Sequence, residues 1–198
     1  MDPWVLQIRA FDDPDWAQIW PILRDIVVEQ ETFAYDPAMT EDEARSMWVI
    51  SPPGRTLVAD SNGQILGTAN MYANRPGPGN HIASGSFMVA RSARGRGVGR
   101  GLVEAALAWA VDSGFAGMQF NAVVEGDLAA EKLYADLGFV MIGTVPGAFN
   151  SPTKGRVGLH VLYDHSPRGE GQRRATLNRA ASRSTSGHHT AARPTVSP

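Results

Sequence analysis

A stretch rich in glycine and arginine, residues 91–101, constrains the fold more than any other part of this chain. An apolar strand-like run at residues 86–89 leads into it, and residues 102–110 carry a helix-like apolar pattern. A glycine-rich turn between a strand and a helix directs backbone N–H groups and the positive helix end toward one spot. The glycines let the backbone approach an anion closely. The stretch therefore predicts a site for a phosphate-bearing cofactor.

The spacing of the glycines decides which phosphate cofactor is expected. A Walker loop needs G-x-x-x-x-G-K-[ST], and this string does not occur in the chain. The dinucleotide fingerprint G-x-G-x-x-G does not fit either, because the glycines fall at positions 95, 97, 99 and 101. The pattern that fits is R-x-x-G-x-G, formed by Arg94, Gly97 and Gly99. It resembles the acetyl-CoA pyrophosphate loop of the Gcn5-related N-acetyltransferase (GNAT) superfamily.

A second block, residues 127–139, is similar to the other hallmark of this superfamily, N-x-x-A-x-x-L-Y-x-x-x-G-F. It differs once, because Asp127 stands where the family usually has Asn; Asp can still cap a helix start. The resemblance covers roughly residues 4 to 164. It implies an α/β (α+β) GNAT fold, with a mixed central sheet of about six to seven strands flanked by about four helices. It also implies an enzyme that transfers acetyl from acetyl-CoA to an amine nitrogen.

Local signals place elements in the order β-α-α-β-β-β-α-β-α-β-β, which is the order of the GNAT fold. Residues 5–8 are predicted to form the first strand, and Pro21 is expected to kink or break the helix that follows. Thr40 and Glu43 form a capping box for a second helix that extends to Trp48. Residues 60–63 indicate a hairpin turn. Residues 146–156 are expected to form a mobile loop between the last two strands.

Composition limits the class of protein. The 198 residues suffice for one domain with an appendage, predicted as a domain at 1–165 and a basic, disordered tail at 166–198. The tail holds six Arg and one Glu, and the remainder is acidic. No cysteine is present, which excludes disulfides and a cysteine nucleophile. No signal segment or membrane span is seen, so we expect a cytoplasmic protein without a membrane partner.

The resemblance assigns the contacts to acetyl-CoA. A backbone N–H at the end of the strand before the loop would hold the thioester carbonyl, the loop would hold the pyrophosphate, and the helix starting at Asp127 would complete the site. The cofactor-binding residues are therefore Phe87, Met88, Val89, Arg94, Gly95, Arg96, Gly97, Val98, Gly99, Arg100, Asp127 and Tyr134. No metal is expected.

Acyl transfer needs a proton acceptor for the amine and a proton donor for the leaving thiolate. Tyr134 stands at the general-acid position of the family, and a phenol of ordinary pKa near ~10 is protonated at neutral pH. A core aromatic residue is the alternative interpretation. Glu31 is the candidate base, with Glu29 weighed equally; His81 and His160 are more typical of structural histidines. No Ser-His-Asp or Cys-His arrangement is seen, so we expect direct attack in a ternary complex.

The acceptor side resembles two groups of the superfamily. Residues 31–37 are similar to the acceptor segment of phosphinothricin-type acetyltransferases, which suggests Phe33 and Tyr35 as substrate-binding residues. Residues 120–124 resemble proline-analogue (azetidine-2-carboxylate) acetyltransferases, in which an Asn faces the substrate. Asn121 would then contact the acceptor, whereas the alternative is an Asn that bridges two splayed strands. A small amino-acid-like amine is the expected acceptor.

Other classes of function stay open. They are a protein or peptide N-acetyltransferase, a non-catalytic acyl-CoA sensor of the same fold, and a nucleic-acid-binding protein that uses the arginines. The acidic body argues against nucleic acid, and retention of Tyr134 argues against the sensor. A homodimer is left open.

Overall fold

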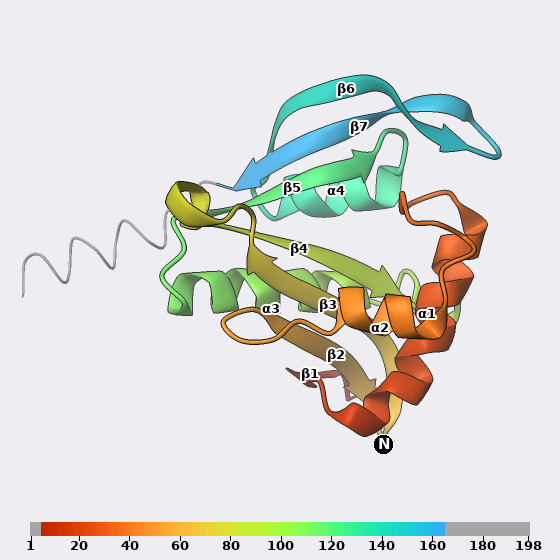
Figure 1. Cartoon of the computed structure of the whole chain (residues 1–198), viewed down its shortest axis with the longest axis vertical. Coiled ribbons are helices and arrows are strands. Elements are labelled where there is room, and N and C mark those ends of the chain that lie inside the picture. Colours follow the sequence, from red (N-terminus) through yellow and green to blue (C-terminus); the bar gives the residue numbers. More distant parts are fainter. Residues whose placement is uncertain (1–4, 165–198) are drawn as a thin grey trace, which may run out of the picture. The chain divides into compact units, whose positions relative to one another are not determined.

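The computed structural model describes residues 5–164, and these form one mixed sheet with helices on both faces (Figure 1). The sheet has seven strands in the order β1-β2-β3-β4-β5-β7-β6. The strands are β1 (Gln7–Ala10), β2 (Arg55–Ser61), β3 (Gln64–Ala73), β4 (Ile82–Val89), β5 (Gly117–Val124), β6 (Val140–Ser151) and β7 (Gly155–Asp164). All neighbouring pairs are antiparallel except β4 and β5. The predicted fold class and element order are confirmed; the basic segment 166–198 lies outside the described residues.

Each face of the sheet has its own apolar core. The helices α1 (Trp16–Glu29) and α2 (Glu41–Trp48) cover one face, where Ile19, Leu23 and Trp48 are buried. The helices α3 (Val98–Asp112) and α4 (Leu128–Asp136) lie on the other face (Figure 1). This arrangement follows from the alternation of side chains along the strands, which sends apolar groups to both faces of the central β3 and β4.

Of the two outcomes expected at Pro21, a kink or a break, the break does not occur. α1 continues through Pro21 as a single helix of 14 residues. Pro21 lies near the start of α1, where its missing N–H would have bonded to the Ala17 carbonyl. Both residues are exposed, so water can satisfy that carbonyl. The first strand also begins two residues later than predicted, at Gln7.

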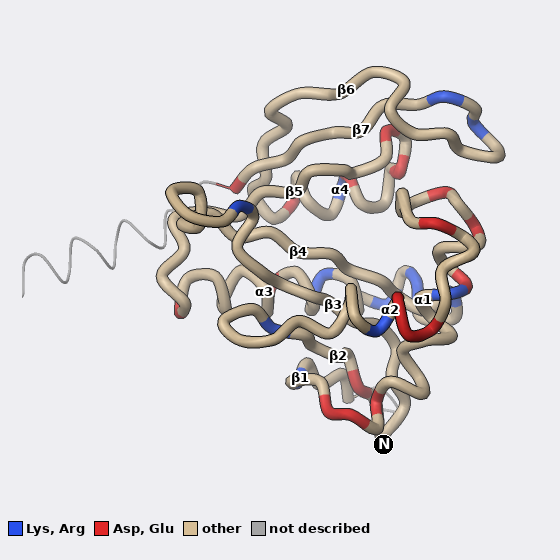
Figure 2. The backbone as a smooth tube through the Cα atoms, in the orientation of Figure 1, with Lys and Arg blue, Asp and Glu red and all other residues tan. Residues whose placement is uncertain are grey.

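The second helix starts as its sequence predicts. Thr40 is the N-cap, its hydroxyl accepts from the Glu43 N–H, and the Glu43 side chain accepts from the Thr40 N–H at 2.9 Å. Three acidic residues, Glu41 to Glu43, occupy the first turn and are visible as a red segment in Figure 2. They favour the positive end of the helix. The turn at residues 62–63 joins β2 and β3, as predicted.

The expected mobile loop at 146–156 is instead mostly strand. β6 extends to Ser151 and pairs with β7 through Phe149↔Val157 and Ser151↔Gly155. The register shifts between Val145 and Phe149, where Pro146 and Gly147 lie. A bulge at this point accommodates both residues without ending the pairing. The hairpin that results extends over the end of α1 (Figure 1).

The central feature for function is the limited pairing of β4 with β5. Their register contains only Ile82↔Gly117 and Ala83↔Met118, although each strand has eight residues. Beyond Ala83 the two strands diverge (Figure 1). From Ser84 to Val89 the β5-facing edge of β4 has no strand partner, so its backbone groups can bond to a ligand. The glycine-rich loop follows β4 and α4 follows β5, which places both at this opening.

Candidate active site

The glycine-rich loop forms the start of α3. Gly97 is the N-cap of α3 with φ 82°, and Gly95 has φ 75°, values that favour glycine. A side chain at either position would point into open space. No side chain caps the first turn of α3, so its N–H groups remain available to an anion. These features fit a pyrophosphate, the part of acetyl-CoA that the sequence assigned to this loop.

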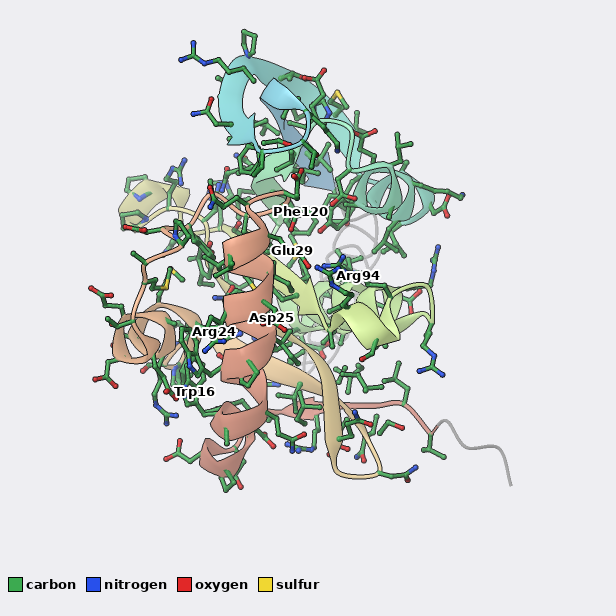
Figure 3. All side chains as sticks on the ribbon, turned by 90° about the vertical axis from the view of Figure 1, so that its right-hand side faces the viewer. Trp16, Arg24, Asp25, Glu29, Arg94 and Phe120 are labelled. Carbon is green, nitrogen blue, oxygen red and sulfur yellow. The ribbon has the colours of Figure 1, made fainter. Side chains whose placement is uncertain are left out.

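Three arginines in this stretch, Arg91, Arg94 and Arg100, have carboxylate partners. Arg94 donates from Nη2 to Glu29 Oε2 at 3.2 Å (Figure 3). Arg91 donates to the other oxygen of the same carboxylate. Arg100 contacts Asp136 on α4 at 3.3 Å. Glu29, weighed as a base from the sequence, thus lies beside the glycine-rich loop as the counter-ion of two arginines. Val98 is buried, so it can contact a ligand only through its backbone.

Successive side chains at the end of β4 point to opposite faces of the sheet. Phe87 and Val89 pack toward α3 and α4, whereas Met88 is buried among residues of α1 and α2. The backbone of all three lies along the unpaired edge of β4. Backbone N–H groups on this edge of β4 therefore have no strand partner at the opening between β4 and β5.

Tyr134 lies on α4, whose start is fixed by Asp127. The Asp127 side chain accepts from the Ala130 N–H at 3.2 Å, which confirms the predicted cap. The ring of Tyr134 packs on Phe120 at 4.8 Å and on Phe139 at 5.7 Å, measured between centroids. Desolvation, with a smaller effect of the Asp127 charge, raises the pKa of Tyr134 well above its usual range. The hydroxyl is therefore held in its protonated, proton-donating form.

Glu31 connects the acceptor segment to the β6–β7 turn. Its carboxylate accepts from the Ser151 hydroxyl at 2.6 Å and from the Thr153 N–H at 3.2 Å. These hydrogen bonds, that of Ser151 above all, lower the pKa of Glu31. Glu31 is ionised at neutral pH, as a base must be, but both of its oxygens already have donors.

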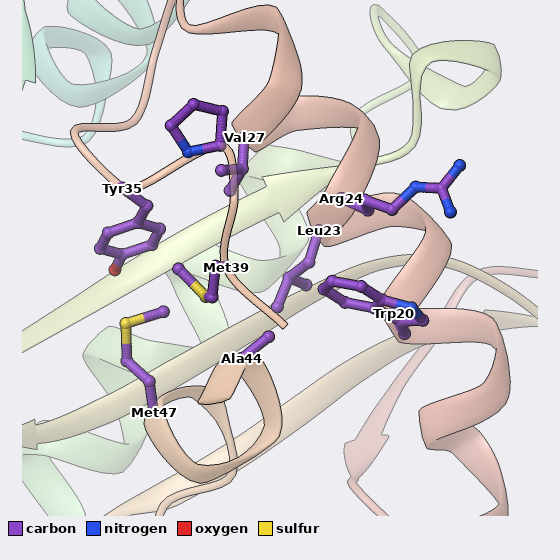
Figure 4. A pocket seen from close by; sticks show the side chains of 9 residues that line it. Trp20, Leu23, Arg24, Val27, Tyr35, Met39, Ala44 and Met47 are labelled. Carbon is purple, nitrogen blue, oxygen red and sulfur yellow. The ribbon is translucent and has the colours of Figure 1, made fainter. Parts of the chain in front are cut away.

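Phe33 and Tyr35 follow α1 and pack against each other with centroids 5.4 Å apart. The Tyr35 hydroxyl shares a hydrogen bond with Ser86 of β4, and burial raises the pKa of Tyr35. Tyr35 also lines a mainly apolar pocket between α1 and α2 (Figure 4). Other side chains in this pocket are Trp20, Leu23, Val27, Met39 and Met47.

Asn121 bridges the two sides of the opening. Its Nδ2 donates to Asn74 Oδ1 at 2.7 Å, and its own Oδ1 accepts from Gln119 at 2.7 Å. Asn74 directly follows β3, which pairs with the other edge of β4. The hydrogen bond between the two Asn side chains therefore connects β5 to the end of β3. Asn121 is exposed and remains accessible to an acceptor. The structure thus provides the strand-bridging contact that the sequence offered as the alternative.

The two histidines lie apart from these groups. His160 on β7 is buried and contacts Thr144 at 2.7 Å and Glu131 at 3.3 Å. His81 is exposed and contacts the Pro78 carbonyl. Within residues 5–164 no cluster of three or more metal-ligating side chains occurs, and no helix there is long and apolar enough to cross a membrane.

Sequence reasoning missed several polar residues on the α1–α2 face of the sheet, namely Asn70, Asn74 and Ser86. Thr68, Asn70 and Tyr72 alternate with the apolar Ala69 and Met71 on β3. This alternation was visible in the sequence and indicates a polar stripe on one face of a central strand.

The comparisons with known proteins agree with this geometry. The model of the Acetyltransferase (GNAT) family matches residues 20–139. N-acetyltransferase aca1 of Schizosaccharomyces pombe is 29% identical over 153 residues, which are 69% of this chain and 73% of that protein. A GCN5-related N-acetyltransferase from Kribbella flavida is 54% identical with a TM-score of 0.79, covering 81% of this chain and 97% of that one.

A phosphinothricin acetyltransferase from Sinorhizobium meliloti, solved in complex with acetyl-CoA, has a TM-score of 0.72. The match covers 80% of this chain and 87% of that one, at 20% identity. At this identity the likeness shows the fold alone.

Proposed function

Because this chain belongs to the GNAT acetyltransferase family and is an N-acetyltransferase with acetyl-CoA as acetyl donor, we propose that its acceptor is a small amino-acid-like amine. We further propose that the amine attacks directly in a ternary complex. The observation that carries the proposal is the opening between β4 and β5, with the glycine loop at one end and neutral polar side chains along it. The chain has no cysteine to form a thioester intermediate.

The donor side is assigned to the loop and to the unpaired edge of β4. The N–H groups at Gly97 to Gly99 would hold the pyrophosphate, and Arg94 and Arg96 would add charge; the free edge of β4 near Met88 would hold the thioester carbonyl. Acetyl-CoA supplies an activated acetyl group with a thiolate as leaving group. The Asp127 carboxylate caps the start of α4. We therefore assign to Asp127 the role of orienting α4.

Tyr134 is assigned as the general acid. Its raised pKa keeps the phenol protonated, and its ring packs on Phe120 of β5, one of the two strands that border the opening. As the new C–N bond forms and the C–S bond breaks, Tyr134 donates its proton to the leaving sulfur and regains one from solvent. The attacking amine releases one proton in the same reaction.

The acceptor side is assigned to Phe33, Tyr35 and Asn121. Two aromatic rings and an amide suit a compact amine with an apolar part and a hydrogen-bonding part. Glu31 stays the predicted proton acceptor. Its hydrogen bonds to Ser151 and Thr153 support an additional role in holding the acceptor segment.

A release assay for free CoA tests the proposal. Purified protein with acetyl-CoA should release thiol with one or more members of a panel of amino acids, proline analogues, phosphinothricin and polyamines, each compared with a lysine peptide. Turnover of the peptide alone would favour the protein-acetyltransferase alternative. Tight acetyl-CoA binding without turnover of any amine would favour the sensor.

A further inference from the structure

The side chain of Asn70 on β3 is buried, and its amide oxygen accepts no hydrogen bond. It is 2% exposed, and its Oδ1 is the one buried side-chain polar atom within residues 5–164 that has no hydrogen-bond partner. Leaving such a group unpaired costs about 1–3 kcal/mol. A position of this kind calls for an explanation, and an absent ligand is a common one.

The neighbours of Asn70 on the same face are satisfied. Thr56, its register partner on β2, donates to the Trp48 carbonyl at 3.1 Å and accepts from the Ile50 N–H. Thr68, two residues earlier on β3, accepts from Trp48 Nε1 at 2.9 Å. The end of α2 therefore supplies partners to both threonines but not to Asn70.

The other side of Asn70 faces the acceptor segment. Its register partner on β4 is Ser86, and paired residues direct their side chains to the same face of the sheet. The Tyr35 hydroxyl is hydrogen-bonded to Ser86 and lies close to Tyr72. Asn70 thus belongs to a patch of neutral polar side chains beneath the segment that follows α1. We call Asn70, Ser86, Tyr72 and Tyr35 the amide floor.

The amide floor adjoins the unpaired part of β4. Ser86 lies three residues beyond Ala83, the last residue of β4 that pairs with β5. Met88, where the thioester carbonyl is assigned, is the next residue of β4 on the same face. An amine that binds at Asn70 would therefore lie beside the edge where the acetyl group is expected.

We propose that Asn70 Oδ1 accepts a hydrogen bond from the N–H of the acceptor amine, and that Tyr35 covers this position until the acceptor enters. The inference rests on the proposed function and narrows its substrate class. No member of the amide floor carries a charge, so an ammonium ion has no counter-ion there. The ammonium form of the acceptor first loses one proton to solvent. The acceptor then binds as a neutral primary or secondary amine. Because Oδ1 is occluded, Tyr35 has to move off Ser86 for the amine to reach it.

The substitution Asn70→Leu separates a binding role from a structural one. It replaces the amide by an apolar group of similar size and removes the unpaired oxygen. We expect the melting temperature to stay or rise, the Kd for acetyl-CoA to stay within about twofold, and kcat/KM for the acceptor to fall at least about tenfold, as for loss of a buried hydrogen bond. An unchanged kcat/KM for the acceptor in the folded variant would overturn the inference.

Thr68→Val is the matched control on the same strand and face. It leaves Trp48 Nε1 without its acceptor, so it should lower the melting temperature while kcat/KM falls less than for Asn70→Leu. Asn70→Ala serves as a second variant if the leucine protein does not fold, with the same expected loss of acceptor kcat/KM. If the wild-type protein turns over no amine in the panel, the proposed function fails. If the wild-type protein turns over an amine and the folded Asn70 variant has the same kcat/KM, only the role of Asn70 is contradicted.

The neutral-amine requirement has its own readout. For two acceptors whose ammonium pKa values differ, the acidic limb of kcat/KM against pH should shift by the same difference. An acidic limb that stays in place for both amines would show that a group on the enzyme controls the proton, and it would overturn this part of the inference.

Discussion

One carboxylate, that of Glu29 at the end of α1, is the partner of Arg94 in the glycine-rich loop, with Nη2 and Oε2 3.2 Å apart (Figure 3). Arg91 contacts the same carboxylate. A phosphate bound at the loop would compete with Glu29 for these guanidinium groups. Since Glu29 leads directly into the acceptor segment, this ion pair also connects the donor side of the site to the acceptor side.

Glu29→Gln should therefore tighten acetyl-CoA binding. Removal of the competing carboxylate frees both arginines for phosphate, and partly exposed ion pairs of this kind contribute about 0.2–1 kcal/mol. We expect the Kd from calorimetry to fall by up to about fivefold. Asp25→Asn removes the same charge one turn earlier on α1, whereas the loop arginines contact Glu29, so the Kd of this variant should not change. Weaker binding in Glu29→Gln would instead show that Glu29 orients Arg94 for the cofactor.

Gly97→Glu should abolish acetyl-CoA binding. The new side chain would point into the open space in front of α3, and it adds both bulk and negative charge. The positive φ of Gly97 also adds strain of about 1–2 kcal/mol. Gly63→Glu is matched, because Gly63 has φ 85° and open space around it in a distant hairpin turn. Both variants should lose similar stability, but only Gly97→Glu should lose acetyl-CoA binding. An unchanged Kd for acetyl-CoA in folded Gly97→Glu would refute the loop assignment.

Asn121→Ala tests whether this amide serves the acceptor or the strands. If it contacts the acceptor, KM for the amine should rise or kcat should fall, with acetyl-CoA affinity nearly unchanged. Asn74→Ala breaks the same bridge but leaves the Asn121 amide in place. Equal effects of the two variants on stability and on KM would assign Asn121 to bridging alone.

Glu31→Gln separates a catalytic base from a structural contact. Loss of a general base should lower kcat by about 10²–10⁴-fold, whereas loss of the contact should mainly raise the acceptor KM. Ser151→Ala removes the strongest hydrogen bond to Glu31 and keeps the carboxylate. A kcat loss confined to Glu31→Gln supports the base, and a shared rise in KM supports the contact.

The lowered pKa of Glu31 also predicts how stability depends on pH. A carboxylate whose pKa is lower in the folded protein stabilises it above the unfolded value, here 4.5, and this contribution is lost as pH falls through the folded value. The difference in free energy of unfolding between wild type and Glu31→Gln should therefore be constant near neutral pH and shrink in acid. Urea titrations at several pH values measure it, and a difference that grows in acid would contradict the assignment.

Tyr134→Phe keeps the ring packed on Phe120 and Phe139 and removes the proton donor. We expect kcat to fall at least about tenfold, with acetyl-CoA affinity and melting temperature nearly unchanged. Because the pKa of Tyr134 is raised, wild-type kcat should not decline where an ordinary tyrosine ionises, near ~10. Phe139→Leu changes the packing on the ring but retains the hydroxyl, so it should affect stability more than kcat. Turnover of Tyr134→Phe within about twofold of wild type, with chemistry rate-limiting, would remove this residue from the mechanism.

The starts of several helices depend on residues close together in the chain, and the sequence alone was enough to predict them. The capping box at Thr40, the cap at Asp127 and the glycine-rich start of α3 act within a few residues, so their positions could be predicted. Where two local signals competed, prediction failed. Pro21 does not break α1, because it sits near an exposed helix start, and Pro146 does not end β6, because a bulge keeps the pairing with β7.

Only the tertiary structure decided which distant groups meet. Glu29 joins Arg94, Glu31 joins Ser151 and Asn121 joins Asn74 because strand order and register bring those segments together. The pairing of β4 with β5 ends at Ala83, and α2 supplies partners to Thr68 but not to Asn70. Such contacts depend on the packing of the whole sheet against both helix layers, and no local pattern of residues encodes them.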